Sequence, residues 1–240
     1  MAADIYSDFD LSAGDLPLFL IRLMRVSPNN LRLAAWLCGL FTVIVGAKLW
    51  IIQVYSTDIP YWDQWDEARL VFQPWLAGHL TWSALFAPHN EHRIFFTRVL
   101  DMLEIRLNGQ WDPRLQMVIN ALIHASYACG LAFCLWRLVG KKWESLICMS
   151  LLPFFAFPVG AEDIIHGFQS QMYFIEIFCL VSLYGLLPGN PWSFRWFWGL
   201  AAAVMSLFTL ASGMLAAIAV VGVILLSRIN VVEKEPPIGD

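Results

Sequence analysis

The chain has 240 residues, of which 59% are hydrophobic and only 14% are charged. A soluble globular domain carries roughly a quarter charged residues, and here the 32 residues between Arg195 and Arg228 include none. This composition excludes an ordinary soluble protein. It predicts an all-α integral membrane protein with about six transmembrane helices, because each span needs about 20 apolar residues. The formal net charge is −4, and no nucleic-acid partner is expected.

The N-terminal part is predicted to be a cytoplasmic tail that leads into the first span. Residues 1–32 contain a short amphipathic stretch at 15–25, which is too short to cross a bilayer and is expected to lie in the membrane interface. The first span covers 33–55 and contains Lys48. The ammonium of Lys48 either reaches toward the nearer membrane surface or faces a polar interior.

Residues 56–114 form the longest segment between spans and are rich in Trp, His and charged residues. They predict a structured outer loop with two amphipathic surface helices, at 66–77 and 91–107. The second helix has an apolar face opposite an ionisable one, which suits a helix lying on the membrane surface. Its ionisable face carries Arg98, Asp101 and Glu104.

Five further apolar stretches follow the outer loop. They cover 115–137, 144–160, 168–187, 196–210 and 213–227. The last two are separated only at Ala211, Ser212 and Gly213, so they form either a tight corner or one kinked helix. The chain therefore has five or six spans.

Basic residues predict the orientation of these spans. With six spans, the basic groups before the first span, between the second and third, and after the last all fall on one side of the membrane. Because Lys and Arg favour the cytoplasmic side, both termini are expected there, in a multi-pass inner (plasma) membrane protein. The membrane domain is 33–227, residues 228–240 form a second cytoplasmic tail, and the loops 56–114 and 160–167 share the outer side.

The segment directly after the first span carries three carboxylates, Asp63, Asp66 and Glu67, between Trp62, Trp65 and Arg69. Aromatic rings remove water from a neighbouring carboxylate and raise its basicity, as a general base or a cation site requires. The alternative interpretation is a helix start, in which Asp63 or Asp66 caps the first turn.

Two more segments carry candidate groups. His89, Glu91 and His92 are typical metal ligands, although a polar helix start explains them about as well. The segment 162–171 places Glu162, Asp163 and amides such as Gln169 at the mouth between the third and fourth spans. Ionisable groups at such a position are a functional hypothesis by default. Since both acidic segments face the outer side, they are expected to form one site.

Isolated polar groups also lie within the predicted spans. Asn120 and His124 are one turn apart and suit hydrogen bonds to a neighbouring helix. Glu176 needs a partner in hydrocarbon, and the sequence offers Lys48 or Arg98 without deciding between them.

This arrangement resembles the GT-C glycosyltransferases, membrane enzymes that use polyprenyl-phosphate sugars. Asp66-Glu67-Ala68-Arg69 matches their acidic pair after the first span, and Trp75 to Gly78 with Trp82 matches the turn that follows. Glu91 falls at the family's second acid, and Glu162 or Asp163 falls in its next outer loop. The resemblance covers residues 33–227. It departs where His92-Arg93 replaces the family's Pro-Pro and where the chain has fewer spans, as in a fragment, a degenerate copy or one part of an assembly.

The resemblance implies transfer of a sugar from a polyprenyl-phosphate donor to a lipid, glycan or protein acceptor, with inversion. The catalytic residues would be Asp66, as general base, and Glu67. The donor and its phosphate would be held by Arg69, Arg93, Arg98 and Gln169, and a divalent metal cation, the one cofactor implied, by Glu91, His92 and Asp163. The expected partners are membrane lipid, the lipid-linked sugar and, if the chain is incomplete, another membrane protein.

Two other functions fit the sequence. Lys48, His124 and Glu176 within spans suit a multi-pass transporter or flippase-like protein. The small number of spans suits a truncated, non-catalytic membrane subunit.

Overall fold

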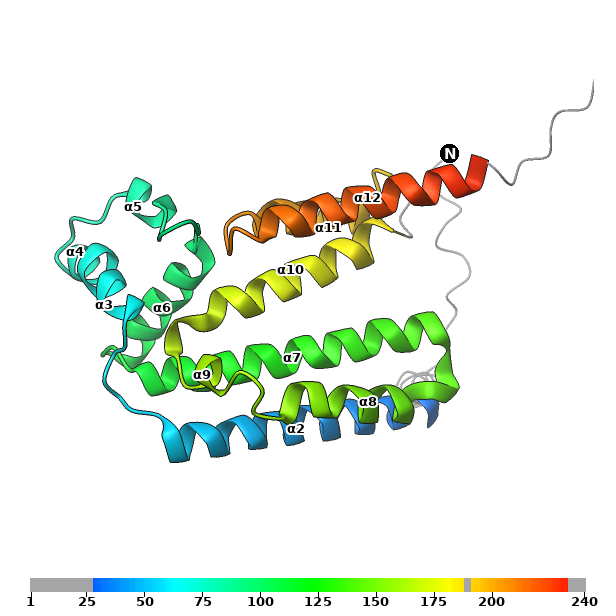
Figure 1. The fold of residues 1–240 in the computed structure, drawn as a ribbon, viewed down its shortest axis with the longest axis horizontal. Helices are drawn as coiled ribbons and strands as arrows, with labels where there is room; N and C mark the ends of the chain where they lie inside the picture. Colours follow the sequence, from blue (N-terminus) through cyan, green and yellow to red (C-terminus); the bar gives the residue numbers. More distant parts are fainter. Residues whose placement is uncertain (1–27, 188–190, 233–240) are drawn as a thin grey trace, which may run out of the picture.

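The computed structural model describes residues 28–187 and 191–232. Every regular element in these residues is helical, which confirms the all-α class. Six helices run beside one another as a bundle (Figure 1). They are α2 (Pro28–Tyr55), α7 (Pro113–Val139), α8 (Glu144–Ala156), α10 (Ser170–Leu186), α11 (Phe194–Ser206) and α12 (Gly213–Val232).

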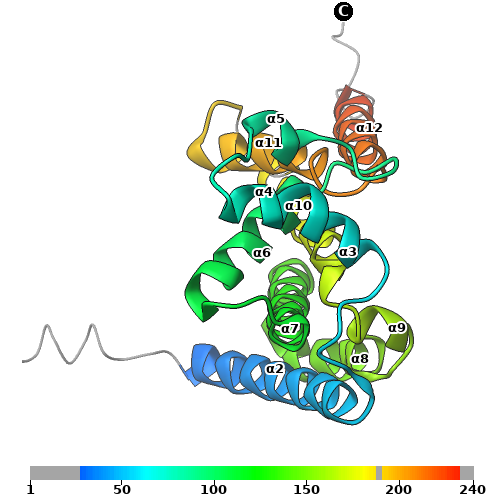
Figure 2. The ribbon, with the colours of Figure 1, turned by 90° about the vertical axis from the view of Figure 1, so that its left-hand side faces the viewer.

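The helices between α2 and α7 gather at the left-hand end of this bundle in Figure 1. A nearly continuous helix is built from α3 (Asp63–Glu67), a π-helical turn (Ala68–Phe72) and α4 (Gln73–Leu76). It is followed by α5 (Trp82–Phe86) and α6 (Phe95–Asn108). The loop between α8 and α10 contains α9 (Ala161–Ile164) and a 3-10 turn (Gly167–Gln169). The start of α2 and the end of α12 lie at the opposite end of the bundle (Figures 1 and 2).

Local sequence explains where the helices begin and end. Asp112 caps α7, because its Oδ1 accepts hydrogen bonds from the backbone N–H groups of Arg114 and Leu115. Helix α6 ends at Gly109, whose φ of 75° lies in the left-handed region that glycine adopts at low cost. Helix α8 ends at Ala156, four residues before the predicted end, since Pro158 favours an extended conformation at Phe157.

Small residues allow the closest helix contacts. A Cβ added to Gly185 of α10 would lie 2.6 Å from the Cα of Gly199 in α11, so the two backbones touch at this point. At the corner between α11 and α12, a Cβ on Gly213 would overlap the carbonyl oxygen of Ser206. This corner joins two separate, packed helices, which decides between the two arrangements predicted for 196–227.

Among residues 28–187 and 191–232, two helices are long and apolar enough to cross a membrane, Asn30–Tyr55 and Pro113–Val139. In the most apolar window of each, 28% of the residues are buried. Helices α8 and α11 have 13 residues each, short of the roughly 20 that a full span requires. The predicted interfacial helix at 15–25 lies outside the described residues.

Helix α6 turns its ionisable face into the protein. Arg98, Asp101 and Glu104 are buried, whereas Val99 and Leu103 on another side of the helix are exposed. The ionisable side of α6 is thus packed inside the protein, and the position of this helix on a membrane surface stays a prediction.

Candidate functional site

Three segments that carry the sequence's candidate groups meet at one end of the bundle. The ring of Tyr61, just before α3, lies 4.6 Å from the ring of His166 in the loop between α8 and α10. The ring of His89 lies 5.1 Å from that of Phe168 in the same loop. Residues 61–67, 89–92 and 162–171 thus belong to one region of the molecule.

A buried amide network holds these segments against α7. The Nε2 of Gln64 donates to the Oε1 of Gln116 over 2.9 Å, and the indole N–H of Trp111 donates to the same oxygen over 3.3 Å. Asn120 of α7 donates to the carbonyl oxygen of Gly167 over 2.8 Å. A Cβ on Gly167 would lie 2.7 Å from the Oε1 of Gln116, so this contact requires glycine.

A buried ion pair between Glu67 and Arg98 lies at the centre of the region. The Nε of Arg98 donates to Oε2 of Glu67 over 2.7 Å, and Nη2 donates to Oε1 over 2.9 Å. Their side chains are 1% and 2% exposed. Two parallel charge-assisted bonds form the strongest geometry for an arginine–carboxylate pair. The Nδ1 of His89 lies 3.0 Å from Oε1 of the same carboxylate.

The remaining donors of Arg98 are used to hold the backbone that follows α5. Nη1 donates to the carbonyl oxygens of Ala84, Leu85 and Ala87 over 3.0, 3.1 and 2.5 Å. The guanidinium is buried with all three nitrogens engaged, so the expectation that Arg98 binds a phosphate does not fit this geometry. Glu67, expected to be catalytic, is equally buried, and its carboxylate binds the side chains of Arg98 and His89.

A tight turn places His89. The backbone N–H of His89 donates to the carbonyl oxygen of His92 over 2.8 Å, and the reciprocal bond is 2.9 Å. Asn90 adopts a φ of 51°, the left-handed conformation that Asn tolerates better than most residues. The turn directs Nε2 of His89 to within 3.4 Å of Oδ2 of Asp63, whose side chain remains 45% exposed.

The ionisable groups of this cluster shift one another's pKa values. Burial acts to raise the pKa of Glu67, but the hydrogen bonds from Arg98 and His89 outweigh it and lower that pKa. The hydrogen bond to Glu67 raises the pKa of His89 against the opposing effect of burial, and the charge of Asp63 adds to the rise. The raised pKa of His89 favours its protonated, cationic form, and Asp63 is the member of the set that solvent reaches.

The other expected surface groups lie outside this cluster. Asp66 and Arg69 pair with each other on the surface, with Nη2 of Arg69 3.4 Å from Oδ1 of Asp66 and both side chains more than half exposed. Arg93 is also exposed. Exposed pairs of this kind contribute little to stability. These residues remain predicted substrate contacts that the geometry does not link to His89.

Gln169 belongs to a polar chain that joins the loop between α8 and α10 to α6. The Nε2 of Gln171 donates to Oε1 of Gln169 over 3.2 Å, and the hydroxyl of Thr97 donates to Oε1 of Gln171 over 3.3 Å. The hydroxyl of Ser170 donates to Thr97 over 2.8 Å. Gln169 is half-buried and positioned by this chain.

The expected metal ligands Glu91, His92 and Asp163 do not come together. Nε2 of His92 lies 3.6 Å from Glu91, while its Nδ1 accepts a hydrogen bond from the backbone N–H of Ala211 at the α11–α12 corner. Asp163 lies in α9 beside Gly160. Within residues 28–187 and 191–232, no group of three or more His, Cys, Asp or Glu side chains is arranged to hold a metal ion.

A second pair of buried acids lies on α6. Burial raises the pKa of Asp101 well above its ordinary range, and the neighbouring charge of Glu104 adds to the effect. Burial also raises the pKa of Glu104 to about 7, with a smaller contribution from Asp112. Both carboxyl oxygens of Glu104 are buried without a hydrogen-bond partner.

The sequence held a signal that separates Asp66 from Glu67. The buried residues of the helix that begins at Asp63 follow the spacing i, i+3, i+4, i+7 and i+8, which defines one helical face. They are Gln64, Glu67, Ala68, Val71 and Phe72. Asp66 falls off this face, and Asp63, one turn before Glu67, borders it. The roles of Asp63 and His89 depend in addition on the turn at Asn90, which periodicity does not reveal.

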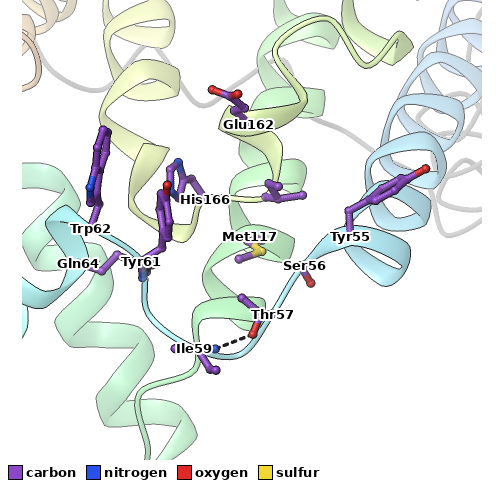
Figure 3. A pocket seen from close by; sticks show the side chains of 11 residues that line it. Tyr55, Ser56, Thr57, Ile59, Tyr61, Trp62, Gln64, Met117, Glu162 and His166 are labelled. Carbon is purple, nitrogen blue, oxygen red and sulfur yellow. Dashed lines mark hydrogen bonds between the residues drawn. The ribbon is translucent and has the colours of Figure 1, made fainter.

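A hollow of about 300 Å³ opens beside the cluster. The rings of Trp62 and Tyr61 stack with centroids 5.8 Å apart, and Tyr61 continues to the ring of His166. Figure 3 shows these three rings close together at the hollow, with Glu162 and Tyr55 also among its lining residues.

Polar groups also meet between the long helices. Nε2 of His124 lies 3.7 Å from Oε2 of Glu176, and the His124 ring stacks on that of Tyr173 at 4.5 Å. The ammonium of Lys48, a residue only 3% exposed, lies 5.9 Å from the centre of the Tyr173 ring. Among the described groups, Glu176 thus contacts His124 without a hydrogen bond, and Arg98 is committed to Glu67.

Comparison of the chain with protein-family models, with curated proteins and with solved structures gives no match.

Proposed function

We propose that this chain is a membrane glycosyltransferase that moves a sugar from a polyprenyl-phosphate donor to an acceptor at the non-cytoplasmic face. The observation that supports this most is the Asp63–His89–Glu67–Arg98 cluster, in which a half-exposed carboxylate is backed by a fixed histidine at the junction of two outer segments. The resemblance of residues 61–93 to the acidic outer loop of GT-C enzymes supports the same function.

In this proposal Asp63 is the general base and the groups behind it are positioning residues. Arg98 fixes Glu67, Glu67 orients His89, and Nε2 of His89 lies 3.4 Å from the carboxylate of Asp63 without a hydrogen bond. Asp63 takes the proton of an acceptor hydroxyl as the oxygen of that hydroxyl bonds to the anomeric carbon. The bond between that carbon and the phosphate oxygen breaks, and the polyprenyl phosphate leaves with its electron pair. General-base catalysis of this kind contributes roughly 10²–10⁴-fold to a rate.

The proposal includes six membrane crossings, with both termini in the cytoplasm. Support comes from the six bundle helices, which run alongside one another (Figure 1); α8 and α11, with 13 residues each, are shorter than a full span. The outward-facing apolar side chains on α2 and α8, among them Val43, Trp50, Met149 and Phe154, need lipid around them. On this topology the predicted inner-membrane location places the cluster at the outer surface. Arg69 and Arg93 are exposed and remain the predicted phosphate contacts, and a divalent cation remains a predicted cofactor.

The test compares two neighbouring aspartates in purified protein reconstituted into liposomes. Transfer of radiolabel is measured from a panel of undecaprenyl-phosphate hexoses to extracted acceptor lipids. We expect Asp63→Asn to lose at least about 100-fold in rate, as loss of a general base does, whereas Asp66→Asn keeps most of the wild-type rate. An equal loss of transfer rate in both variants would leave Asp66 as a candidate general base. Full activity of Asp63→Asn would contradict the mechanism.

A second candidate, a transporter of lipid-linked sugars, is favoured by a different observation, the group of Lys48, His124 and Glu176 between the long helices. Buried ionisable groups between membrane helices commonly line substrate or ion paths. The two functions separate in proteoliposomes that hold the lipid-linked sugar in one leaflet. If Glu176→Gln abolishes exchange between leaflets while the wild type transfers no sugar to any acceptor, the protein is a transporter. A non-catalytic subunit would do neither.

A further inference from the structure

The aromatic hollow and an apolar groove lie end to end on the same two chain segments. The groove, of about 560 Å³, lies between α2 and α8 and is lined by Trp50 and Ile51 on one side and Phe157 and Pro158 on the other. Tyr55, four residues beyond Ile51, lines the hollow. Four helical residues rise about 6 Å. The hollow and the groove are therefore separated along α2 by less than the length of a lipid headgroup.

The second wall shows the same order. Phe157 and Pro158 line the groove, and Glu162, four residues later, lines the hollow. An amphiphile with its acyl chain in the groove would therefore place its headgroup in the hollow. The change from apolar lining to hydroxyl, amide and carboxylate lining occurs along both walls, as at the boundary of a bilayer.

The lining of the hollow selects the headgroup. None of its eleven lining residues, all described by the structure, is Lys or Arg, and its acid is Glu162. Arg114 donates to the carbonyl oxygen of Ser56 and is not among the lining residues. An anionic phosphate headgroup would face a carboxylate without a fixed cation. The flat rings of Trp62 and Tyr61 and the acceptor oxygens of Glu162 instead suit the apolar face and the hydroxyl groups of a sugar ring.

We infer that this hollow and groove bind a glycolipid with an uncharged sugar headgroup, chain against α2 and α8 and sugar against Tyr61, Trp62 and Glu162. That this lipid is the acceptor rests on the proposed transferase function, but the binding does not require a donor. The anionic polyprenyl-phosphate donor then approaches from a different side of Asp63.

The test uses the full chain in phosphatidylcholine nanodiscs containing a small fraction of brominated lipid, whose acyl bromines quench nearby tryptophan. The signal is the quenching lost on Trp50→Phe. We expect dibrominated monoglucosyl diacylglycerol to quench Trp50 more strongly than dibrominated phosphatidylglycerol or phosphatidylcholine at equal fraction. Tyr61→Leu and Glu162→Gln, both at exposed side chains, should weaken apparent affinity about five-fold, as loss of one hydrogen bond does. Trp82→Leu, an exposed tryptophan in α5, is the matched control and should leave affinity unchanged.

Equal quenching by all three lipids would show ordinary annular lipid and overturn the site, and stronger quenching by phosphatidylglycerol would overturn the choice of headgroup. Unchanged affinity in both Tyr61→Leu and Glu162→Gln would remove the hollow from the site. Selective glycolipid binding without any sugar transfer would keep this site and refute the transferase, whereas transfer without selective binding would do the reverse.

Discussion

Glu67 and Glu104 are two glutamates buried at the same end of the molecule, yet their pKa values shift in opposite directions. Glu67 has Arg98 and His89 as partners, and its pKa is lowered. Glu104 has no hydrogen-bond partner, and its pKa is raised to about 7. Burial disfavours the charged form in both. Whether a buried acid stays ionised is decided by the hydrogen-bond donors around it. Here those donors are Arg98 and His89, and His89 lies beside Asp63.

The largest expected effect tests the donors of Glu67. Arg98→Met should lower the free energy of unfolding by about 3–5 kcal/mol, because it leaves a buried carboxylate without its charge partner. Thermal unfolding in detergent measures the change. Arg69→Met removes an arginine from an exposed pair and is the matched control, with an expected change within about 1 kcal/mol. Similar losses in both variants would contradict the difference between the two pairs.

The second prediction concerns Glu104 and depends on pH. Its folded pKa of about 7 lies above the unfolded value of 4.5, so the folded state holds the extra proton between these values. The resulting stability is present below about pH 4.5 and is lost as pH rises through 7. Glu104→Gln should therefore raise stability at pH 8 by on the order of 2 kcal/mol after allowance for screening, and change it little near pH 4.

The same series of melting temperatures against pH checks this sign. Asp101 and Asp112 remain in the variant and act on both proteins. A Glu104→Gln protein that is less stable than wild type at pH 8, with the loss shrinking toward pH 4, would show that Glu104 is ionised and paired in the folded state.

A third prediction tests the contact between Gly167, in the loop between α8 and α10, and Gln116 of α7. Gly167→Ala places a Cβ against Gln116 and Gln64 and should cost about 1–3 kcal/mol, the usual range for overpacking. Gly39→Ala in α2 meets no atom within 4 Å and should be neutral or stabilising by up to about 1 kcal/mol. Equal unfolding midpoints for the two variants would place the 162–171 segment away from Gln116.

The smallest expected effect concerns His89. Its pKa is raised in the folded state, so its ion pair contributes stability that is fully present below pH 6.5 and lost as pH rises through the folded pKa. His89→Gln should cost about 1 kcal/mol more at pH 6 than at pH 9, as the net value of a hydrogen bond to a charged group suggests. Chemical unfolding at both pH values measures the difference, and a larger loss at pH 9 would reverse the assignment.

Much of the fold was accessible from the sequence because apolar runs and helix ends are local properties. The end of α2 at Tyr55 and the separate helices after the outer loop follow from hydropathy and from residues such as Asp112 and Gly109. The early end of α8 was missed because the apolar run continues beyond Ala156, where the helix ends ahead of Pro158.

The candidate site was accessible only in part. The sequence identified the three segments that meet, since charge and aromatic residues concentrate in them. It selected Asp66, Glu67 and Arg98 as groups that contact substrate, whereas the structure buries Glu67 and Arg98 against each other and leaves Asp66 with Arg69. The pairing joins residues 31 positions apart, and a contact of that separation depends on how α3 and α6 pack.

The most direct measurement of the central claim is the side of the membrane on which the two acidic segments lie. In a cysteine-free background, Asp66→Cys, Glu162→Cys and Lys142→Cys are labelled in intact, oriented vesicles with a membrane-impermeant maleimide. We expect Asp66→Cys and Glu162→Cys to react from the non-cytoplasmic side and Lys142→Cys only from the other. Reaction of Asp66→Cys and Glu162→Cys from opposite sides would contradict a shared site and, with it, the proposed enzyme.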